Sequence, residues 1–283
     1  MFKQTMATII VLASTAIGAS AGLMDDAKAG KPVRVGFAEQ EPFIVTGPNG
    51  QLTGYEVDLL KAVLTKMGID AQLEAVPTQF GALIPGLQAK RFDIIASDLY
   101  IRPDRCKLVA FAEPTHFVND GLIVPAGNPK AIHGFQDVAK DPSLKMGYLV
   151  GGGPIADHAL AMGVKKEQLV ALPDIASLLA AVKTDRIDAF LNTGVTIQST
   201  VKTANDPTIE RAMPFEQAVI DGKTAMGIGS YAFRLEDKDF VADFDKQLLA
   251  ILTSDQATKI GEPYGFTRED IPAGKPTTED LCK

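Results

Sequence analysis

The chain carries the same order of secondary-structure signals twice. Apolar runs typical of strands are separated by segments whose apolar residues recur at helical spacing. The first series predicts strand 33–37, helix 58–67, strand 71–76, helix 80–89 and strand 92–96. The second predicts strand 145–150, a helix ending at 162, strand 169–172, helix 175–183 and strand 187–191. Strands that alternate with helices form mostly parallel sheets, so we expect an α/β protein of two lobes.

Two segments are candidates for the crossings between these lobes. Residues 122–128 run from an apolar strand into prolines and a glycine, and residues 226–232 follow an Asp-Gly turn. An amphipathic helix at 239–252 would then return the chain to the first lobe. We therefore predict lobe 1 at 22–125 plus 229–283 and lobe 2 at 126–228. Two lobes joined by a two-stranded hinge can close around a cleft.

The first 21 residues have the pattern of a secretory signal peptide. Lys3 lies in a short polar start, residues 7–17 are mostly apolar, and small residues follow at 19–21. The apolar run is shorter than the roughly 20 residues that span a bilayer. We therefore predict that residues 1–21 are a signal peptide, that the mature chain starts near Gly22 and that it works in the periplasm.

Composition and motif content argue against several classes of function. The net charge of −7 at pH 7 argues against nucleic acid and against an anionic membrane surface as partners. The three histidines lack the spacing of metal ligands, and the glycine-rich turn at 151–153 is not followed by the lysine of a phosphate loop. No hydrolase or metalloprotease motif is found in the sequence. We therefore predict a protein that is not an enzyme and that uses no cofactor and no metal.

The only two cysteines are Cys106 and Cys282. In an oxidising compartment such a pair favours a disulfide, although two unpaired thiols are the alternative. A bridge would tie the C-terminal tail to the first lobe, in agreement with the predicted return of the chain.

Side chains suited to binding follow the predicted strands. Open parallel sheets bind ligands at the carboxyl ends of their strands. In lobe 1 these ends carry Gln40, Glu41, Phe43, Phe80, Asp98, Tyr100 and Arg105, and in lobe 2 they carry Gly153, Pro154, Asn192 and Thr193.

The chemistry of this set suits a small zwitterion. Aromatic faces attract cations, and the fork of Arg105 can grip a carboxylate through two hydrogen bonds. Backbone N–H groups at a helix start, as after the turn at 151–153, also favour an anion. Taken singly, each aromatic residue could belong to the core and Arg105 could be a surface base.

Several segments resemble the amino-acid-type solute-binding proteins of ABC importers. They are 54–59 (GYEVDL), 80–87 (FGALIPGL), 92–95 (FDII), 104–105 with 109–111, and 263–266 (PYGF). Within that family, 81–89 (GALIPGLQA), 102–106 (RPDRC), 262–266 (EPYGF) and the late cysteine are most similar to the ectoine- and hydroxyectoine-binding proteins. The resemblance implies the bilobal type II periplasmic-binding-protein fold, a monomer, and the membrane subunits of an importer as partner.

The resemblance also implies roles for particular residues. Phe43, Phe80 and Tyr100 would form an aromatic box around a cyclic zwitterion, with Arg105 on its carboxylate. The chain departs from the subgroup in Gln40, Asp98 and Pro154, and Thr193 stands where ordinary amino-acid binders carry an acid. Proline has no N–H, so Pro154 removes a donor to the carboxylate.

These departures leave alternatives open. Besides ectoine or hydroxyectoine, the ligand could be another polar amino acid or an opine. An exported enzyme similar to cyclohexadienyl dehydratase is a further alternative, and turnover of prephenate or arogenate would identify it. A sensing protein that docks on a receptor is a third.

Overall fold

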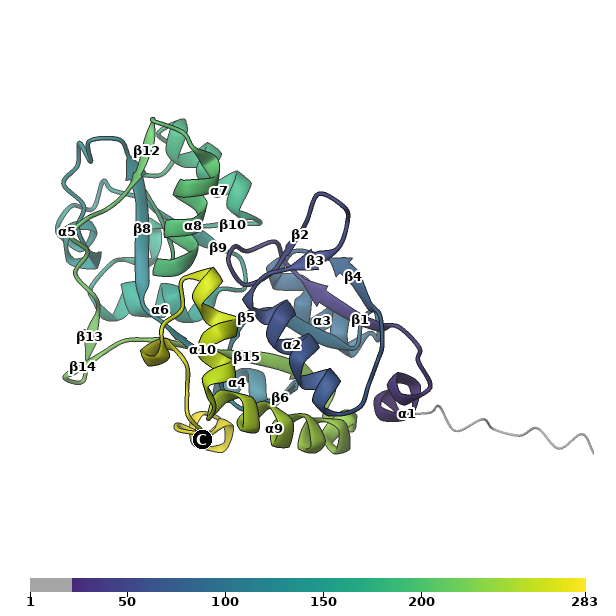
Figure 1. Cartoon of the computed structure of the whole chain (residues 1–283). Coiled ribbons are helices and arrows are strands. Elements are labelled where there is room, and N and C mark those ends of the chain that lie inside the picture. The colour runs from purple at the N-terminus through teal and green to yellow at the C-terminus, as the bar shows by residue number, and fades with distance from the viewer. Residues whose placement is uncertain (1–21) are drawn as a thin grey trace, which may run out of the picture.

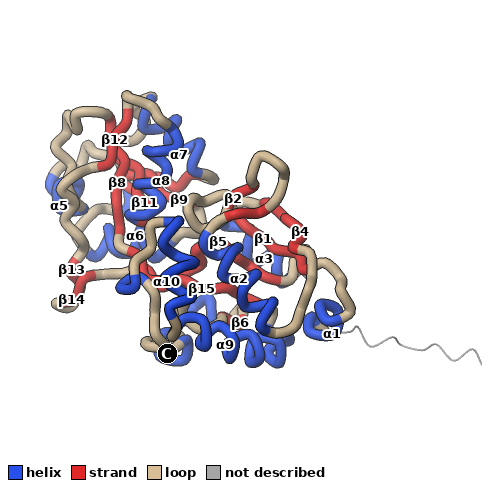
Figure 2. The backbone as a smooth tube through the Cα atoms, in the orientation of Figure 1, coloured by secondary structure: helices blue, strands red, loops and turns tan. Residues whose placement is uncertain are grey.

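Two sheets, each covered by helices on both faces, form the two lobes of the molecule (Figure 1). The computed structural model describes residues 22–283, without the side chains of Gly153 and Pro154. The expected signal peptide, residues 1–21, lies outside the described residues. The strands of the two sheets lie in separate halves of the molecule (Figure 2).

The first sheet contains the strands of the first predicted series and one late strand. Its order is β4 (Leu73–Pro77), β1 (Val33–Phe37), β5 (Ile94–Tyr100), β15 (Gly227–Phe233) and β6 (Ala110–Phe111), and β7 (His116–Val118) also pairs with β15. β1 is parallel to β4 and β5, whereas β15 is antiparallel to its neighbours. The sheet is therefore mixed, because the chain returns to this lobe through β15.

Helices cover both faces of this sheet. Ile94 and Ile95 are fully buried neighbours on β5, but Ile94 packs in one apolar cluster and Ile95 in another on the opposite face. Helices α1 (Leu23–Lys28), α2 (Tyr55–Lys66), α9 (Lys238–Leu252) and α10 (Asp255–Gly261) supply the first cluster. The second receives α3 (Leu83–Gln88), α4 (Pro103–Cys106) and α11 (Thr278–Leu281).

The second sheet repeats this arrangement. Its order is β10 (Leu169–Leu172), β9 (Met146–Leu149), β11 (Ala189–Thr193), β8 (Asp120–Pro125) and β12 (Ile209–Arg211). Leu122 and Ile123 of β8 again point to opposite apolar clusters. One cluster includes α5 (Phe135–Lys140) and α6 (Gly153–Ala161), and the other includes α7 (Ile175–Lys183) and α8 (Gly194–Ala204). Two short hairpins, β2 (Val45–Thr46) with β3 (Leu52–Thr53) and β13 (Val219–Ile220) with β14 (Lys223–Thr224), lie outside both sheets.

The strand at 120–125 belongs to the second sheet and is not the crossing that we expected at 122–128. β8 lies between β11 and β12 and is antiparallel to both, which explains why its residues are almost all buried. The change of sheet falls at Asn119, between β7 and β8, and the return falls at 225–226, before β15. We therefore propose that the first segment of lobe 1 ends at residue 119 instead of the predicted 125.

Two strands that carry candidate site residues end later than predicted. β5 runs to Tyr100 instead of residue 96, and β11 runs to Thr193 instead of residue 191. β15 pairs with β5 as far as Tyr100, and β8 pairs with β11 as far as Thr193. Pairing with strands distant in the sequence therefore extends both strands into the region between the lobes.

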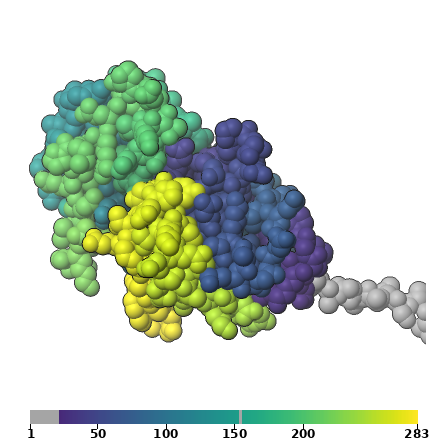
Figure 3. Space-filling model, in the orientation of Figure 1, coloured from purple at the N-terminus to yellow at the C-terminus, as the bar shows by residue number. Residues whose placement is uncertain are grey.

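A disulfide joins Cys106 to Cys282, with the two Cα atoms 5.8 Å apart. It links the end of α4 to the C-terminal segment, and this is the pair that the sequence analysis favours. The C-terminal segment, yellow in Figure 3, lies on the surface of the first lobe.

Candidate functional site

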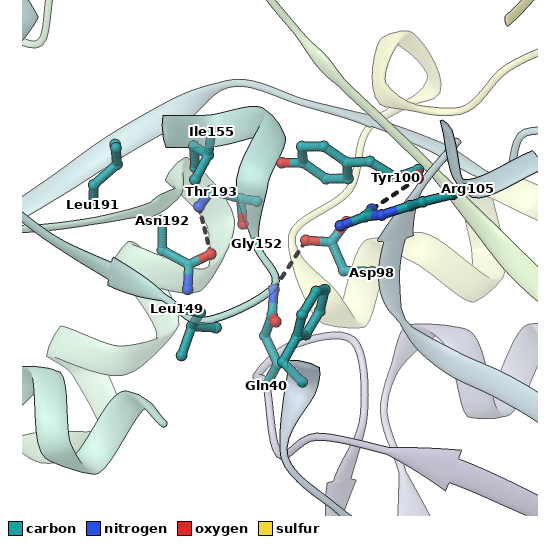
Figure 4. Close-up of a pocket in the computed structure, with 11 residues that line it drawn as sticks. Gln40, Asp98, Tyr100, Arg105, Leu149, Gly152, Ile155, Leu191, Asn192 and Thr193 are labelled. Carbon is teal, nitrogen blue, oxygen red and sulfur yellow. Dashed lines mark hydrogen bonds between the residues drawn. The ribbon is translucent and has the colours of Figure 1, made fainter. Parts of the chain in front are cut away.

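A pocket lies between the facing edges of the two sheets (Figure 4). About 350 Å³ of space not filled by atoms, open solvent included, lies in this region. The first lobe lines it with Gln40, Phe80, Asp98, Tyr100 and Arg105, and the second lobe lines it with Leu149, Gly152, Ile155, Leu191, Asn192 and Thr193. Both lobes therefore contribute side chains to one space between them.

Arg105 is the cation of the pocket. It lies in the short helix α4 and is only 8% exposed. Nη1 donates to the carbonyl oxygen of Tyr100 at 2.9 Å, and Nη2 donates to the carbonyl oxygen of Gly151 at 2.6 Å. Burial lowers the pKa of Arg105 to about 10, so the guanidinium keeps its charge at neutral pH. No acidic side chain of the described residues forms an ion pair with it, which leaves the charge available to an anionic ligand group.

Asp98, on strand β5, supplies a buried carboxyl group at the pocket. Its backbone has φ of 49° and its side chain lies between two partners. Oδ1 is 2.8 Å from Nε2 of His116, and Oδ2 accepts a hydrogen bond of 2.9 Å from Nε2 of Gln40. Burial raises the pKa of Asp98 well above its ordinary value.

Behind Asp98 lies a fully buried group of titratable residues. Both carboxylate oxygens of Glu56 accept from the backbone N–H of Asp98, at 3.1 and 3.2 Å. Burial raises the pKa of Glu56 to about 8 and lowers the pKa of His116 to about 4. His116 also contacts the hydroxyl of Thr115 at 2.9 Å and is 0% exposed, so it has no access to the pocket. This group fixes the position of Asp98 and is not itself a place for chemistry on a ligand.

Two polar atoms at the pocket have no hydrogen-bond partner among the described residues. They are Oε1 of Gln40 and the hydroxyl oxygen of Tyr100, and both are buried. An unpaired buried polar atom costs about 1–3 kcal/mol. Hydrogen-bonding groups of a ligand would remove this cost.

The ring of Tyr100 lies directly over β15. Gly227 has no side chain, and a Cβ at this position would lie 2.1 Å from Cζ of Tyr100. This glycine therefore leaves room for the ring of Tyr100 at the first residue of β15. Through this contact between Gly227 and Tyr100, strand β15 supports one wall of the pocket.

Asn192 and Thr193 form the polar end of the second lobe. Oδ1 of Asn192 accepts from the N–H of Thr193 at 2.7 Å, which fixes the amide group. The hydroxyl of Thr193 accepts from the N–H of Thr196 and caps the N-terminus of α8. Both residues are buried, so the wall that they form is polar but uncharged.

Two expected site residues, Phe43 and Glu41, lie elsewhere. Phe43 is 0% exposed and packs in the core, where its ring centroid is 4.8 Å from that of His116 and 5.5 Å from that of Phe266. It does not line the pocket, because the turn after β1 directs it into the apolar cluster of lobe 1. Glu41 also lies outside the pocket, and its carboxylate accepts a hydrogen bond of 2.6 Å from Thr203.

Gly153 and Pro154 are the first two residues of α6, directly after the pocket residue Gly152. The surroundings of Gly153 and the side chain of Pro154 lie outside the described part of the structure. The apolar wall of lobe 2, formed by Leu149, Ile155 and Leu191, was missed in the sequence analysis. Leu149 and Leu191 lie near the ends of strands β9 and β11, and Ile155 lies in the first turn of α6. Only polar, aromatic and glycine-rich positions were considered as candidates, so these apolar residues were left out.

The lobes touch each other around the pocket. Hydrogen bonds cross between them from Arg102 to Asp157 at 2.5 Å, from Gln40 to Thr196 at 3.3 Å and from Thr203 to Glu41 at 2.6 Å. A Cβ on Gly151, whose φ is 83°, would lie 2.8 Å from Cα of Gly81 in the other lobe. The structure is therefore closed over the pocket.

Among residues 22–283, no group of three or more His, Cys, Asp or Glu side chains could hold a metal ion. In the same part of the chain, no helix has the length and apolar character needed to cross a membrane.

Comparison with known proteins gives a consistent family. Residues 33–267 match the model of the bacterial extracellular solute-binding proteins, family 3. The probable amino-acid ABC transporter periplasmic-binding protein y4tE of Sinorhizobium fredii is 34% identical over 266 residues, 93% of this chain and 87% of the relative. The L-cystine-binding protein TcyJ of Escherichia coli is 27% identical over 66% of this chain and 68% of its own length.

Solved structures show the same fold. EhuB in complex with hydroxyectoine is similar with a TM-score of 0.79 and 30% identity, over 92% of this chain and 98% of EhuB. An ancestral arginine-binding protein bound to arginine has a TM-score of 0.69 at 23% identity, over 83% of this chain and 98% of its own, and supports the fold alone.

Proposed function

The chain belongs to the bacterial extracellular solute-binding proteins, family 3, and on that premise we propose that it captures a small zwitterion between its lobes for an ABC importer. The observation that carries this proposal is Arg105, a buried cation without an acidic partner, in the same pocket as the rings of Phe80 and Tyr100. A carboxylate would bind the guanidinium, and a cationic group would lie against the ring faces.

The pocket also offers acceptors for the cationic end of such a ligand. Asp98 and the unpartnered Oε1 of Gln40 both lie on the lobe 1 side, together with the aromatic rings. The facing wall of lobe 2 is apolar or neutral, with Leu149, Ile155 and Asn192. This asymmetry favours a compact ligand whose charged groups both face lobe 1.

Within this class we propose ectoine, hydroxyectoine or a closely related amino-acid derivative as the ligand. The likeness to EhuB over almost the whole chain supports this choice. Gln40 and Asp98 depart from the pattern that the resemblance implies, so another polar amino acid or an opine is the competing ligand.

Binding and release by hinge closure need no covalent step, and we propose that the protein is not an enzyme. His116, the histidine nearest to Asp98, is buried behind the pocket wall and cannot reach a substrate. A precursor of cyclohexadienyl dehydratase has a TM-score of 0.70 at 24% identity, which reflects the shared fold. Turnover of prephenate or arogenate by the purified protein would contradict the proposal.

The remaining parts of the proposal concern its setting. We propose that the mature protein is a periplasmic monomer that presents its closed, ligand-bound form to the membrane subunits of the importer. Association of the closed form, but not of the ligand-free form, with reconstituted membrane subunits would support this role over that of a sensor.

A thermal-shift screen tests the function directly. A ligand that binds the native state raises the melting temperature. The screen contains ectoine, hydroxyectoine, proline betaine, the common amino acids and opines, and calorimetry then gives the affinity of each compound that raises the melting temperature. The proposal fails if no zwitterion stabilises the protein, or if Arg105→Ala binds the same compound as tightly as the natural protein does.

A further inference from the structure

Gln40 separates the pocket from a second hollow at the mouth of the cleft. The second hollow lies between the segment 39–45 of lobe 1 and helices α7 and α8 of lobe 2. It is lined by Glu39, Gln40, Glu41, Val45, Ile175, Ala176, Leu179, Thr200, Thr203 and Ala204. Among the described residues, Gln40 alone lines both spaces.

Hydrogen bonds to both lobes fix the side chain of Gln40 between the pocket and the second hollow. It is 3% exposed, and its Nε2 donates to Asp98 in its own lobe and to Thr196 in the other lobe, at 2.9 and 3.3 Å. Figure 4 shows the amide group directed toward Asp98. Its backbone is fixed too, because its N–H donates to Ile44 at 3.0 Å and its carbonyl accepts from Phe43 at 2.9 Å.

The hollow beyond this wall is mainly apolar, and two glutamates at its edge carry negative charge. Val45, Ile175 and Leu179 supply apolar side chains. The carboxylate of Glu39 accepts from the N–H and hydroxyl of Thr46, and that of Glu41 accepts from Thr203. Neither glutamate forms an ion pair with a described residue, so the hollow suits an apolar chain, and its edge favours a cation at the end of that chain.

We propose that Gln40 sets the length of the ligand by closing the pocket against this hollow. With Gln40 in place, the site takes a compact zwitterion. With a small residue at this position, the two spaces join, and the site takes a longer zwitterion whose distal cation lies beside Glu39 and Glu41. This inference rests on the proposed function, because it concerns the same pocket.

The test compares two substitutions of Gln40. Gln40→Ala removes the wall, whereas Gln40→Met keeps its length and loses only the hydrogen bonds. The short probes are ectoine and L-proline, and the long probes are L-arginine and its uncharged analogue of equal length, L-citrulline. Affinities are measured by calorimetry, and circular dichroism checks that each variant is folded.

We expect Gln40→Ala to bind L-arginine at least about tenfold more tightly than the natural protein does, the discrimination that a change in pocket shape can provide. Gln40→Met should show no such gain, and L-citrulline should gain less than L-arginine. In the double variant Gln40→Ala with Ala176→Phe, the new ring fills the hollow and the gain should disappear.

Three results overturn the inference. They are the absence of a gain in Gln40→Ala, an equal gain in Gln40→Met, and tight binding of L-arginine by the natural protein. In each of these cases binding of a short probe by the natural protein leaves the proposed function intact. If no probe binds any of the proteins, the proposed function fails and the inference fails with it.

Discussion

The guanidinium of Arg105 donates a hydrogen bond of 2.6 Å to the carbonyl oxygen of Gly151, and this bond crosses from the first lobe to the second. Gly151 lies in the turn that leads into α6, two residues before the helix begins. The side chain proposed to hold the ligand carboxylate therefore also holds the lobes together. Ligand capture and closure are expected to depend on the same cation.

Replacement of Arg105 by alanine should weaken ligand binding by about 2–4 kcal/mol, because a buried carboxylate would lose its charged partner. Isothermal titration calorimetry measures the change. Arg91→Ala is the matched control, because Arg91 is exposed and lies outside the pocket. Near-equal affinities of the two variants for the ligand would show that Arg105 does not bind it.

Removal of the Tyr100 hydroxyl should affect binding and not folding. The hydroxyl oxygen is buried without a partner, so Tyr100→Phe should not lower the melting temperature of the ligand-free protein. If a ligand supplies the missing partner, affinity should fall by about 1 kcal/mol. Tyr100→Ala, which also removes the ring, should cost about 1–2 kcal/mol through the lost cation–π contact. A lower melting temperature of Tyr100→Phe with unchanged affinity would instead indicate a structural hydroxyl.

Phe43 and Phe80 should respond in opposite ways to the same substitution. Phe43→Leu should lower the free energy of unfolding by about 1–2 kcal/mol, because Phe43 packs in the core against Phe266. Its effect on affinity should be small. Phe80→Leu removes a ring from the pocket and should weaken binding more than Phe43→Leu does. Denaturant titration measures the stability of both variants, and calorimetry measures their affinity for the ligand. A larger loss of affinity in Phe43→Leu than in Phe80→Leu would indicate that Phe43 contacts the ligand.

The buried carboxyl groups make stability depend on pH. Burial raises the pKa of Glu56 to about 8 and that of Asp245 to about 7, so the folded state holds protons that the unfolded state has lost. The contribution of each group to stability is complete below its ordinary pKa, 4.5 for Glu56 and 3.8 for Asp245, and is lost as the pH rises through its folded pKa. Burial lowers the pKa of His116 from 6.5 to about 4, so this residue makes the protein less stable as the pH falls below 6.5. Above pH 6.5 it does not contribute to the pH dependence of stability.

The melting temperature should therefore fall between about pH 6.5 and pH 8, because each group lowers the free energy of unfolding by up to about 1.4 kcal/mol per pH unit until its folded pKa is reached. Glu56→Gln should make the fall smaller, because an amide does not titrate. Its oxygen can still accept from the N–H of Asp98, so the local structure should be kept. Thermal unfolding across this range checks the sign. A constant or rising melting temperature would show that these carboxyl groups are ionised in the folded protein.

Loss of the disulfide should lower stability. The bridge between Cys106 and Cys282 spans a sequence separation of 176 residues. The chain-entropy model gives about 4–5 kcal/mol for a loop of this size, and measured values are often smaller. Replacement of both cysteines by serine should lower the melting temperature by about 5 °C or more. A melting temperature that does not change would mean that the tail is held by other contacts, such as that of Thr278 with Ala112.

The order of strands and helices followed from the sequence because it depends on local patterns. The strand and helix signals placed most elements close to their observed bounds, for example strand 169–172 and helix 175–183. Helix α2 begins three residues before the predicted 58, since Gly54, with φ of 129°, precedes its first turn. The segment 80–89 contains a 3₁₀ turn at Phe80–Ala82 before α3.

Part of the pocket lining was predictable from the sequence, because residues that follow parallel strands lie at the same edge of a sheet. Gln40, Phe80, Asp98, Tyr100, Arg105, Asn192 and Thr193 all line the pocket in the structure. The structure places Phe43 in the core and not at the pocket, for a reason that the sequence does not contain. Whether a ring after a strand points into the cleft or into the core depends on the path of the turn and on distant partners such as Phe266.

By itself, the sequence determined two β-α-β-α-β series, the residues at their strand ends and a pair of cysteines able to bridge, because each of these is a matter of local pattern or composition. Only the tertiary structure decided that strand 120–125 joins the second sheet, that Gly151 accepts from Arg105 and that Gln40 forms a wall between two spaces. Such contacts join residues far apart in the chain, and their geometry depends on how complete lobes pack against each other.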